Sequence, residues 1–473
     1  MRGSVSDAAG PFLEGVSPIT GRLVAWQEAA LADPAMLSAL LDEHGSPVNL
    51  IDPDPLPAHA EELVGAAAGL GVELRVFFAR KANKSIAVAE TALAAGRGVD
   101  VSSERELTQL LDRGADPARL ILTAAIKPPR LLELALERGV VVSIDNHDEL
   151  DAVHRLAGGR RAAVALRLSA PVGLAPSRFG FTGVEAAALV DDPAVWSDLT
   201  LVGVHFHLHG YAAADRAVAL DAALDLVEHA RARGLSPAFV DIGGGIPMTY
   251  VDDPGPWDEF WRAHTAALLG QGPSVTWADH ALGRVVAGDE VTGAPAVYPL
   301  WQQPIRGDWL RELLRSPSQA GGTVAERTTR LGVRLQAEPG RALLDGCGLT
   351  VARVAFRKRS ADGDWLIGLE MNRTQCRSAA LDFLLDPVLI PTGSSRSAPG
   401  EGFLVGAYCI EAELLTWRRL RFPHGVAVGD LVVFVNTAGY QMHILESASH
   451  QIPLARNLVP GADGWELDPI DLV

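Results

Sequence analysis

A lysine directly after a short apolar run is the first residue of this sequence that could do covalent chemistry. Lys81 lies in the segment Phe78-Ala79-Arg80-Lys81-Ala82-Asn83-Lys84. Burying an ammonium group is costly unless the group is paired or reacts. The segment therefore has two interpretations. Lys81 forms a Schiff base with an aldehyde, with burial lowering its pKa, or it is a lysine at the rim of the fold in a salt bridge.

Three histidines alternate with other residues at the end of another apolar run, as His205, His207 and His209. Side chains two residues apart along a strand point to the same face, so the spacing predicts all three histidines on one face. An H-x-H pattern on a strand is a common spacing of metal ligands, which makes a metallohydrolase one alternative. Stacking on an aromatic cofactor and hydrogen bonding within the core are the other two.

Two further segments have the composition of an anion site. Three glycines follow an apolar run at 243–245, and glycines leave backbone N–H groups free to approach an anion closely. Glu338 and Arg341 follow another run, separated by Pro-Gly. The arginine suits a phosphate, and a buried glutamate needs a cationic partner. A plain turn and an internal Glu–Arg ion pair are the simpler alternatives.

All four segments follow short apolar runs that alternate with helix-like stretches. Eight such runs predict a parallel (β/α)₈ barrel of the TIM type. Such barrels place their chemistry at the carboxyl ends of the strands, so the four segments are expected to meet there. The runs are 76–79, 99–101, 120–123, 140–144, 164–168, 201–206, 239–242 and 333–337, and helical patterns include 103–113, 129–137, 147–156 and 214–233.

The alternation fails in two places, which predicts two domains. At about 250–330 a long insertion interrupts the barrel and holds five of the ten tryptophans, namely Trp257, Trp261, Trp277, Trp301 and Trp309. It predicts a packed subdomain, or else a lid on the substrate side or a surface for a partner. After residue 345, β-like runs separated by turn residues predict a C-terminal all-β domain over 346–473, with residues 1–45 packed against it. The barrel is expected over 46–345. The β-like runs are 349–356, 365–369, 402–407 and 431–435.

Composition excludes several classes of function. There are 41 lysine and arginine residues against 58 aspartate and glutamate residues, giving a formal net charge of −17, and no basic cluster offsets it. This argues against a protein that binds nucleic acid or an anionic membrane. No apolar run reaches the ~18 residues that span a bilayer, and the N-terminus lacks the apolar core of a secretory signal. Three cysteines without C-x-x-C spacing predict a reduced, cytoplasmic protein.

Together the four segments describe one site rather than four. A lysine that reacts with an aldehyde, a histidine that stacks on a ring, a phosphate cradle and a carboxylate are what pyridoxal 5′-phosphate (PLP) requires. A carboxylate beside the pyridine nitrogen would keep that nitrogen protonated, so that the ring withdraws electrons strongly. No metal is needed in this interpretation.

The chain resembles the fold-type III PLP enzymes, whose barrel is like that of alanine racemase, and within them the ornithine/diaminopimelate decarboxylases. The resemblance runs from about residue 45 to 459 in matching order. It implies that the K-A-N lysine, Lys81, holds PLP and that His207 stacks on the ring. It also implies that Glu338 contacts the pyridine nitrogen. The implied phosphate contacts are Gly243, Gly244, Gly245, Arg341 and Tyr440, the last from a segment similar to A-G-A-Y.

The β domain carries a further implied catalytic residue. Gly406-Ala407-Tyr408-Cys409 resembles the family's G-x-x-C, whose cysteine reaches the partner subunit's site. The resemblance therefore implies a homodimer with shared active sites. It also implies a reaction in which the substrate loses its α-carboxylate as CO₂ and Cys409 protonates Cα. From the residue type alone, Cys409 would be a small buried hydrophobe.

The substrate is the least defined part of the resemblance. The usual H-I-G-S becomes His207-Leu208-His209-Gly210, and Ile410 stands where the family places an acidic residue after the cysteine. Diaminopimelate, a basic amino acid or a related one all fit, and a substrate tethered to a carrier protein is a further alternative. Candidate substrate contacts are Arg178, Arg373, Asp382 and Glu411.

Three other functions remain alternatives. A PLP-dependent racemase, or another reaction at Cα, could use the same fold. A metallohydrolase would use His205, His207 and His209, but it leaves Lys81 and the glycines unexplained. A non-catalytic PLP-binding protein is the third, although relatives of that kind usually lack the β domain.

Overall fold

A closed barrel of eight parallel strands forms one half of the chain, in a computed structural model that describes residues 11–377 and 384–472. Neighbouring strands pair in the order β12-β3-β4-β5-β6-β7-β8-β9. This confirms the predicted (β/α)₈ barrel, and each predicted apolar run overlaps one strand. The strands are β3 (Leu74–Ala79), β4 (Gly98–Val101), β5 (Leu120–Leu122), β6 (Val141–Ile144), β7 (Ala162–Leu168), β8 (Leu199–Phe206), β9 (Phe239–Asp241) and β12 (Arg334–Ala337).

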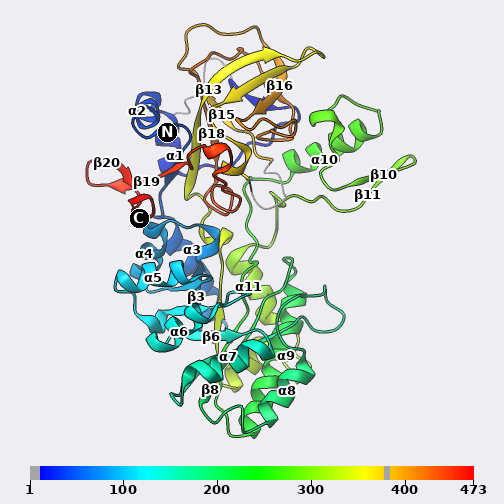
Figure 1. The fold of residues 1–473 in the computed structure, drawn as a ribbon. Coiled ribbons are helices and arrows are strands. Elements are labelled where there is room, and N and C mark those ends of the chain that lie inside the picture. Colours follow the sequence, from blue (N-terminus) through cyan, green and yellow to red (C-terminus); the bar gives the residue numbers. More distant parts are fainter. Residues whose placement is uncertain (1–10, 378–383, 473) are drawn as a thin grey trace.

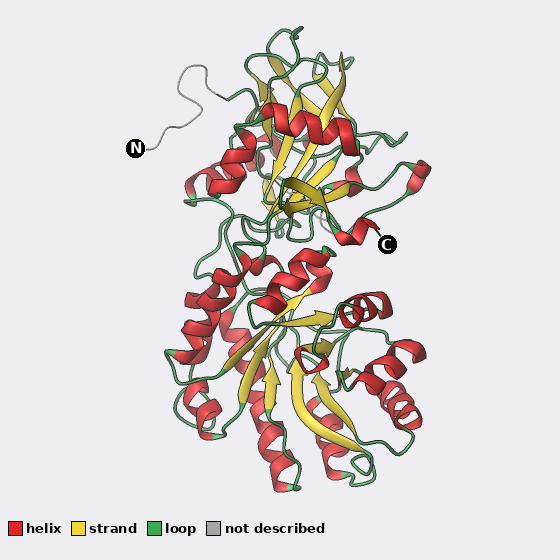
Figure 2. Cartoon of the chain, turned by 90° about the vertical axis from the view of Figure 1, so that its left-hand side faces the viewer, coloured by secondary structure: helices red, strands yellow, loops and turns green. Residues whose placement is uncertain are grey.

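Helices surround the barrel (Figure 2). Several of them begin and end at residues that are typical of helix ends. In α5 (Glu104–Asp112) the Ser103 hydroxyl accepts a hydrogen bond from the Glu106 N–H, and leucines at i, i+3 and i+4 are buried. Gly139 ends α6 (Pro129–Arg138) in the left-handed conformation. The four predicted helical stretches match within one residue at each end. The other barrel helices are α3 (Leu56–Ala68), α4 (Ile86–Ala94), α7 (His147–Ala157), α8 (Gly183–Asp191), α9 (Ala213–Ala232), α11 (Arg306–Arg315) and α12 (Val324–Arg330).

A ten-stranded sheet forms the other half, above the barrel in Figure 1. The long strand β13 (Gly348–Arg359) is its centre and pairs with β14, β18 and β2. The remaining strands are β1 (Glu14–Gly15), β2 (Val48–Ile51), β14 (Trp365–Leu369), β15 (Val388–Ile390), β16 (Gly400–Val405), β17 (Leu420–Phe422), β18 (Leu431–Val435), β19 (Arg456–Gly461) and β20 (Gly464–Leu467).

The N-terminal segment joins this sheet. β1 pairs with β17, and two helices, α1 (Ala25–Leu31) and α2 (Pro34–His44), precede β2. β2 pairs with β13 and β19, so it belongs to the sheet although the sequence places it in the barrel at 46–345. The sheet region therefore takes strands from both ends of the chain and the barrel lies between them.

The tryptophan-rich insertion divides into two parts. Its first part contains α10 (Gly255–Leu268) and the hairpin of β10 (Val285–Ala287) and β11 (Glu290–Thr292), and it lies beside the sheet region (Figure 1). There Trp277 meets Phe403 edge-on with ring centroids 4.9 Å apart, and His280 stacks on Trp417 at 4.0 Å. The second part forms α11 and α12 of the barrel. The expected extent of 250–330 is therefore too long, because its last residues supply barrel helices.

One hydrophobic core joins the two halves. It includes barrel residues such as Val76, and also Leu349, Val351 and Val433 from the sheet. A second core lies between the sheet strands alone. Short 3₁₀ turns connect the elements; they are η1 (Arg80–Ala82), η2 (Pro117–Arg119), η3 (Trp277–Asp279), η4 (Arg341–Leu343), η5 (Arg373–Gln375), η6 (Ser449–Gln451) and η7 (Pro469–Leu472). Among the described residues, no helix has the length and apolar character needed to cross a membrane.

Candidate active site

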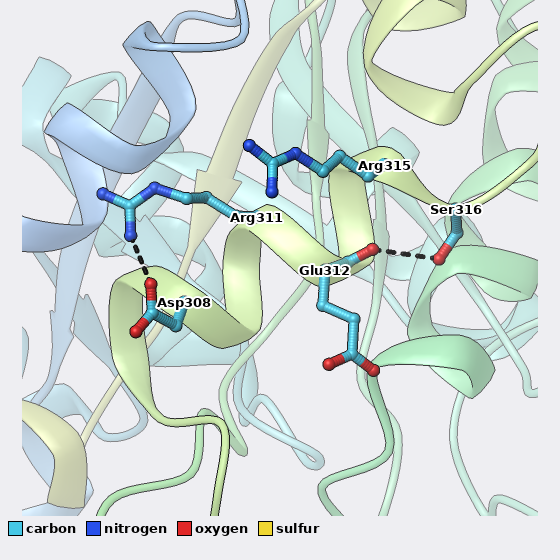
Figure 3. Close-up of a pocket in the computed structure, with 5 residues that line it drawn as sticks. All are labelled: Asp308, Arg311, Glu312, Arg315 and Ser316. Atoms are coloured by element: carbon cyan, nitrogen blue, oxygen red, sulfur yellow. Dashed lines mark hydrogen bonds and ion pairs between the residues drawn. The ribbon is translucent and has the colours of Figure 1, made fainter.

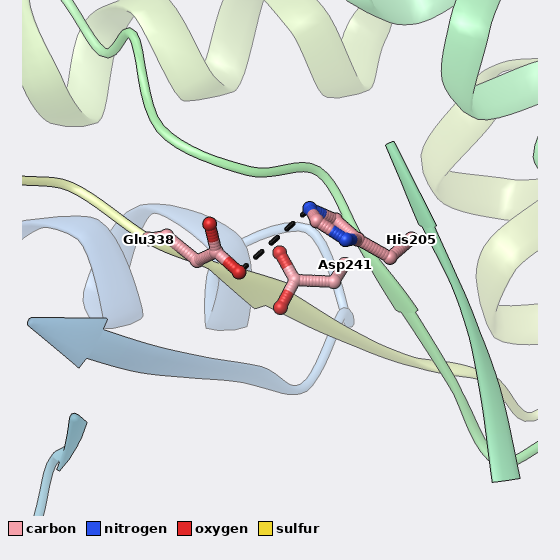
Figure 4. A group of neighbouring side chains, drawn as sticks. All are labelled: His205, Asp241 and Glu338. Carbon is pink, nitrogen blue, oxygen red and sulfur yellow. Dashed lines mark ion pairs between the residues drawn. The ribbon is translucent and has the colours of Figure 1, made fainter. Parts of the chain in front are cut away.

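Ionisable side chains from five strand ends meet at one end of the barrel. Lys81 is in η1 after β3, and its Nζ lies 3.1 Å from Oδ2 of Asp100 on β4. Figure 4 shows His205 of β8, Asp241 of β9 and Glu338, which follows β12, pointing toward one another. The Nε2 of His205 lies 3.7 Å from Oε1 of Glu338. The carboxyl ends of the strands thus bring together the segments that the sequence singled out.

Lys81 is an accessible amine beside buried acids. Its side chain is 38% exposed, whereas that of Asp100 is fully buried. Burial lowers the pKa of Lys81, but the charges of Asp100 and Glu338 outweigh it, so the pKa is raised above the ordinary lysine value. The sequence-based expectation of a lowered pKa is therefore wrong, because it ignored the two carboxylates.

The loop that carries Lys81 is held from the sheet region. The Asn83 side-chain amide donates to the Ala438 carbonyl at 3.0 Å, and the Tyr440 N–H donates to the Ala82 carbonyl at 2.8 Å. Both contacts join the K-A-N segment to residues 436–440, which follow β18. The position of the lysine thus depends on both halves of the chain.

The carboxyl groups of Asp241 and Glu338 are buried and hold protons more readily than usual. Burial raises the pKa of Asp241 to about 7, and burial together with the charges of Asp100 and Asp241 raises the pKa of Glu338 well above its ordinary value. Asp241 accepts a hydrogen bond from the Gly243 N–H at 2.8 Å. Within the described residues, Oε1 of Glu338 has no hydrogen-bond partner. A buried carboxyl oxygen without a partner is the expected feature of a ligand contact.

The three histidines do not share a face. His205 is buried on β8, with Nδ1 2.7 Å from the Ser143 hydroxyl, but the strand ends at Phe206 and His209 is exposed. The predicted alternation is wrong because it runs past the end of the strand. Burial lowers the pKa of both His205 and His207, so the two imidazoles are neutral at neutral pH. The arrangement does not support a metal site made of the three histidines.

His207 lies at the glycine loop. Its Nδ1 accepts a hydrogen bond from the Gly244 N–H at 3.2 Å. Gly243 and Gly245 have φ of 67° and 76°, values that favour glycine. A Cβ on Gly243 would lie 2.7 Å from the His207 ring and one on Gly244 would lie 2.6 Å from the Glu338 carbonyl oxygen. Only glycines therefore fit between the histidine and the Glu338 segment.

Arg341 lies in a cage of tyrosines that the sequence did not reveal. Its Nη1 donates to the Tyr250 hydroxyl at 3.2 Å, and its guanidinium carbon lies 4.1 Å from the Tyr298 ring centroid and 5.1 Å from that of Tyr440. The Tyr211 ring is in turn edge-on to Tyr298. Four of the five tyrosines of the chain thus gather here. Tyr440 is brought to Arg341 as the resemblance implies.

Two acids of the cluster, Asp100 and Asp241, were also missed. Each is a charged residue inside an apolar run, in Val99–Val101 and in Phe239–Ile242. A charge on a strand that is otherwise buried is the signal that could have identified them, because such a charge must face a partner or a site.

The candidate substrate residues are not in contact with this cluster. Cys409 and Glu411 are exposed in a loop of the sheet region, and Arg373 donates from its guanidinium to the Ala412 carbonyl at 2.8 Å. Arg178 is exposed beside Phe179 on the β7–α8 loop. Among the described residues, none of these four bonds to Lys81 or to its buried neighbours. Asp382 lies outside the described residues. The exposure of Cys409 rules out the buried small hydrophobe that its residue type suggests.

A surface depression elsewhere does not compete with this site. It has a volume of about 520 Å³ on α11 and is lined by Asp308, Arg311, Glu312, Arg315 and Ser316 (Figure 3). Two of its charged side chains pair with each other, with Arg311 Nη1 2.6 Å from Asp308 Oδ1. It is an exposed helix face with no buried polar group directed into it.

Comparisons with known proteins place the chain in a family. Residues 60–271 match the family model described as pyridoxal-dependent decarboxylase, pyridoxal binding domain. An uncharacterized protein y4yA of Sinorhizobium fredii is 34% identical, with 87% of each chain covered. Diaminopimelate decarboxylase of Pseudomonas aeruginosa is 24% identical, with 92% of this chain and 93% of that protein covered.

A solved structure shows the same fold. The diaminopimelate decarboxylase of M. jannaschii, in complex with L-lysine, matches with a TM-score of 0.68 at 16% identity, covering 91% of this chain and 90% of that one. The residues present fit PLP: an accessible amine, an unpartnered buried carboxyl oxygen and a glycine loop beside a caged arginine meet at one end of the barrel. The chain therefore belongs to the fold-type III PLP-dependent decarboxylases.

Proposed function

We propose that this chain decarboxylates an amino acid with PLP held covalently on Lys81. The observation that carries the proposal is the position of the Lys81 amine, 3.1 Å from Asp100 and next to the buried pair of Asp241 and Glu338. A lysine with this exposure beside acids that are shielded from water suits a group that must exchange a proton and then react.

PLP supplies an electron-withdrawing ring that takes up the electron pair when the bond from Cα to the carboxylate breaks. The chain's own residues prepare this step. Because its pKa is raised, Lys81 must first give a proton away, and Oδ2 of Asp100 is the nearest acceptor. Glu338 would hold a proton against the pyridine nitrogen, and His207 would lie on the face of the ring.

The glycine loop and Arg341 would bind the phosphate. The tyrosine cage keeps the guanidinium of Arg341 in one orientation through the hydrogen bond to Tyr250 and the ring of Tyr298. An oriented arginine and free N–H groups at a glycine loop are the usual protein contacts of a phosphate. Tyr440, next to Arg341, is proposed as a further contact.

A homodimer with shared sites is part of the proposal. Cys409 is exposed beside Ile410, whose side chain is 51% exposed, on a loop with no contact to Lys81 among the described residues. An exposed apolar residue and a thiol on such a loop suit burial against a second copy of the chain, where Cys409 would protonate Cα. The expected cytoplasmic location stays a prediction; among the described residues, no disulfide joins Cys347, Cys376 or Cys409.

We propose diaminopimelate, a basic amino acid or a related amino acid as substrate, free or tethered to a carrier protein. The support is the diaminopimelate decarboxylase of Pseudomonas aeruginosa and the L-lysine complex of the M. jannaschii protein. Arg178, Arg373, Glu411 and Asp382 remain the proposed contacts of the distal group. An arginine would select a distal carboxylate and an acid would select a distal amine.

The test is a screen of amino acids for CO₂ release, with chiral analysis of what remains. Decarboxylation predicts stoichiometric CO₂ and amine from one class of substrate, abolished in Lys81→Ala. Conversion of one enantiomer to the other without CO₂ would replace this proposal by a racemase. An Arg373→Gln variant that loses acidic substrates but keeps basic ones would assign the distal carboxylate to that residue.

A further inference from the structure

A buried arginine holds two loops of the site together. Arg216, in the first turn of α9, is 1% exposed. Its Nη2 donates to the Gly244 carbonyl at 2.6 Å, to the Leu208 carbonyl at 3.2 Å and to the Gly210 carbonyl at 3.3 Å. One guanidinium group therefore joins the loop of residues 207–210 to the glycine loop of residues 243–245.

The charge of Arg216 is costly where it lies. The N-terminal end of a helix repels a positive charge, and burial lowers the pKa of Arg216 to about 10, which still leaves it protonated at neutral pH. Within residues 11–377 and 384–472, no carboxylate is within salt-bridge distance of its guanidinium, and its Nε has no hydrogen-bond partner. The carbonyls offset part of this cost, and a bound anion would offset the rest.

The geometry of the peptide bond determines where the N–H groups of these loops point. A trans peptide is planar, with its N–H pointing opposite to its carbonyl. Because Arg216 binds the carbonyl of Gly244, the N–H of Gly245 points away from the guanidinium. The carbonyl oxygen of Gly245 is 3.4 Å from the same Nη2, so the N–H of Ile246 also points away from the guanidinium. In the described part of the chain, these two N–H groups donate to no acceptor.

The arginine is also enclosed. A Cβ on Gly245 would lie 2.1 Å from Arg216 Nη2, so the loop closes directly on the guanidinium. Trp309 of α11 is 1% exposed, and its ring centroid lies 5.8 Å from the guanidinium carbon. The indole N–H of Trp309 donates to the Tyr211 carbonyl at 2.7 Å. Water has little access to this contact, so its electrostatic effect is strong.

We propose that Arg216 is a positioning residue for the phosphate group of PLP. It fixes the two loops through their carbonyls, turns the N–H groups of Gly245 and Ile246 toward the phosphate, and adds an unopposed positive charge behind them. This inference rests on the proposed role of the glycine loop as the phosphate site, but it assigns a function to a residue outside the loop's own sequence.

The test compares two ligands that differ only in the phosphate. The full-length protein, freed of PLP, is titrated with PLP and with pyridoxal by absorption spectroscopy. Arg216→Met is expected to weaken PLP binding about 10- to 100-fold, the range for lost charge-assisted hydrogen bonds. Pyridoxal binding is expected to change less than about threefold by the same reasoning. The ³¹P resonance of bound PLP should also shift in the variant.

Arg327 provides the matched control. It is also 1% exposed, but its guanidinium is paired with Asp221, Asp225 and Glu228 between α9 and α12. Arg327→Met removes a buried arginine of the same helix layer and should leave the ratio of PLP to pyridoxal affinity unchanged. If the role of Arg216 were merely structural, the two variants would have the same ratio of PLP to pyridoxal affinity.

Each outcome separates this inference from the proposed function. If Arg216→Met loses PLP and pyridoxal affinity equally, or keeps both, the inference is wrong while the proposed function stands. A wild-type protein that binds no PLP would refute the proposed function itself. If Arg216→Met does not fold, Arg216→Gln is used, because its amide removes the positive charge but keeps a hydrogen-bond donor. A ratio of PLP to pyridoxal affinity equal to that of the wild type would then overturn the inference.

Discussion

At the scale of single residues, several acids around one amine determine the protonation of the site. Asp100 is fully buried and lies next to the accessible Lys81 amine. Asp241 and Glu338 hold protons more readily because burial disfavours their charged forms. Asp100 is therefore the acid that controls the charge of Lys81, although no motif in the sequence pointed to it.

Replacing Asp100 by Asn should change the pH dependence of covalent PLP capture. The Asp100 charge raises the pKa of Lys81, and only the uncharged amine attacks the aldehyde. Removing that charge lowers the pKa, so the rise of the capture rate with pH should move to lower pH. Stopped-flow absorption over a pH series measures this.

Asp116→Asn is the control for that series, because Asp116 is an exposed acid that caps η2. Its profile should overlay that of the wild type. A profile for Asp100→Asn that is unmoved, or moved to higher pH, would contradict the role assigned to Asp100.

Much of the site was predictable at this scale because its residues follow apolar runs in order. Lys81, His207, the three glycines, Glu338 and Arg341 all lie at strand ends, where the barrel brings them together. Tyr250 and Tyr298 could not be predicted, because they belong to the two ends of an irregular insertion. The insertion has no regular hydrophobic pattern from which its path back to the barrel could be inferred. His209 was misplaced because the alternating histidines continue past Phe206, where β8 ends, so the sequence does not show where the strand stops.

At the scale of elements, the lysine loop is fixed by the C-terminal end of the chain. Asp468, which follows β20 and is fully buried, accepts hydrogen bonds from the Ile86 and Ala87 N–H groups and from the Ser85 hydroxyl. It thus caps α4, the helix that begins just after the K-A-N segment. A buried carboxylate that accepts several N–H bonds is a strong helix cap.

Asp468→Asn should therefore destabilise the fold and loosen the lysine loop. Loss of hydrogen bonds to a buried charge predicts a decrease of about 2 kcal/mol in the free energy of unfolding. Urea denaturation followed by circular dichroism measures it, and hydrogen exchange at residues 83–88 should increase. Asp33→Asn, at the exposed cap of α2, should cost less than about 1 kcal/mol. Equal stabilities of both variants and the wild type would refute the role of Asp468 as a cap of α4.

The barrel strands could be predicted from the sequence more readily than some strands of the sheet. Barrel strands are buried on both sides and read as apolar runs. In contrast, β2 pairs with β19 from the opposite end of the chain, and β19 pairs with β20. Their pairing is set by tertiary contacts, so local sequence did not reveal it. The separation of β2 and β19 along the sequence also explains why residues 48–51 belong to the sheet, although the predicted boundary places them in the barrel.

At the scale of the whole molecule, a neutral histidine helps to join the barrel to the sheet region. His443 accepts a hydrogen bond from the Lys84 N–H and lies 2.7 Å from the Asn457 side-chain oxygen on β19. Burial, with the charge of Lys84, lowers the pKa of His443 to about 3. The unfolded chain binds the proton near pH 6.5, so between these values the unfolded state binds more protons and stability falls as pH falls.

A His443→Gln variant tests this contribution, because an amide can both donate and accept but does not titrate. Wild type should lose up to about 1.4 kcal/mol more than the variant for each pH unit below 6.5. Urea unfolding of both proteins at pH 7.5 and 5.5, under the same PLP concentration, gives the difference. Parallel losses in the two proteins would show that His443 does not titrate on unfolding.

The most direct test is to locate the covalent bond to PLP. The protein is incubated with PLP, reduced with borohydride and mapped by mass spectrometry. Covalent attachment at Lys81 predicts one pyridoxyl adduct on that residue, absent from Lys81→Ala. It should be retained in Lys84→Ala, which removes the neighbouring lysine that pairs with Glu446. An adduct on another lysine, or no adduct in a protein that binds PLP, would contradict it.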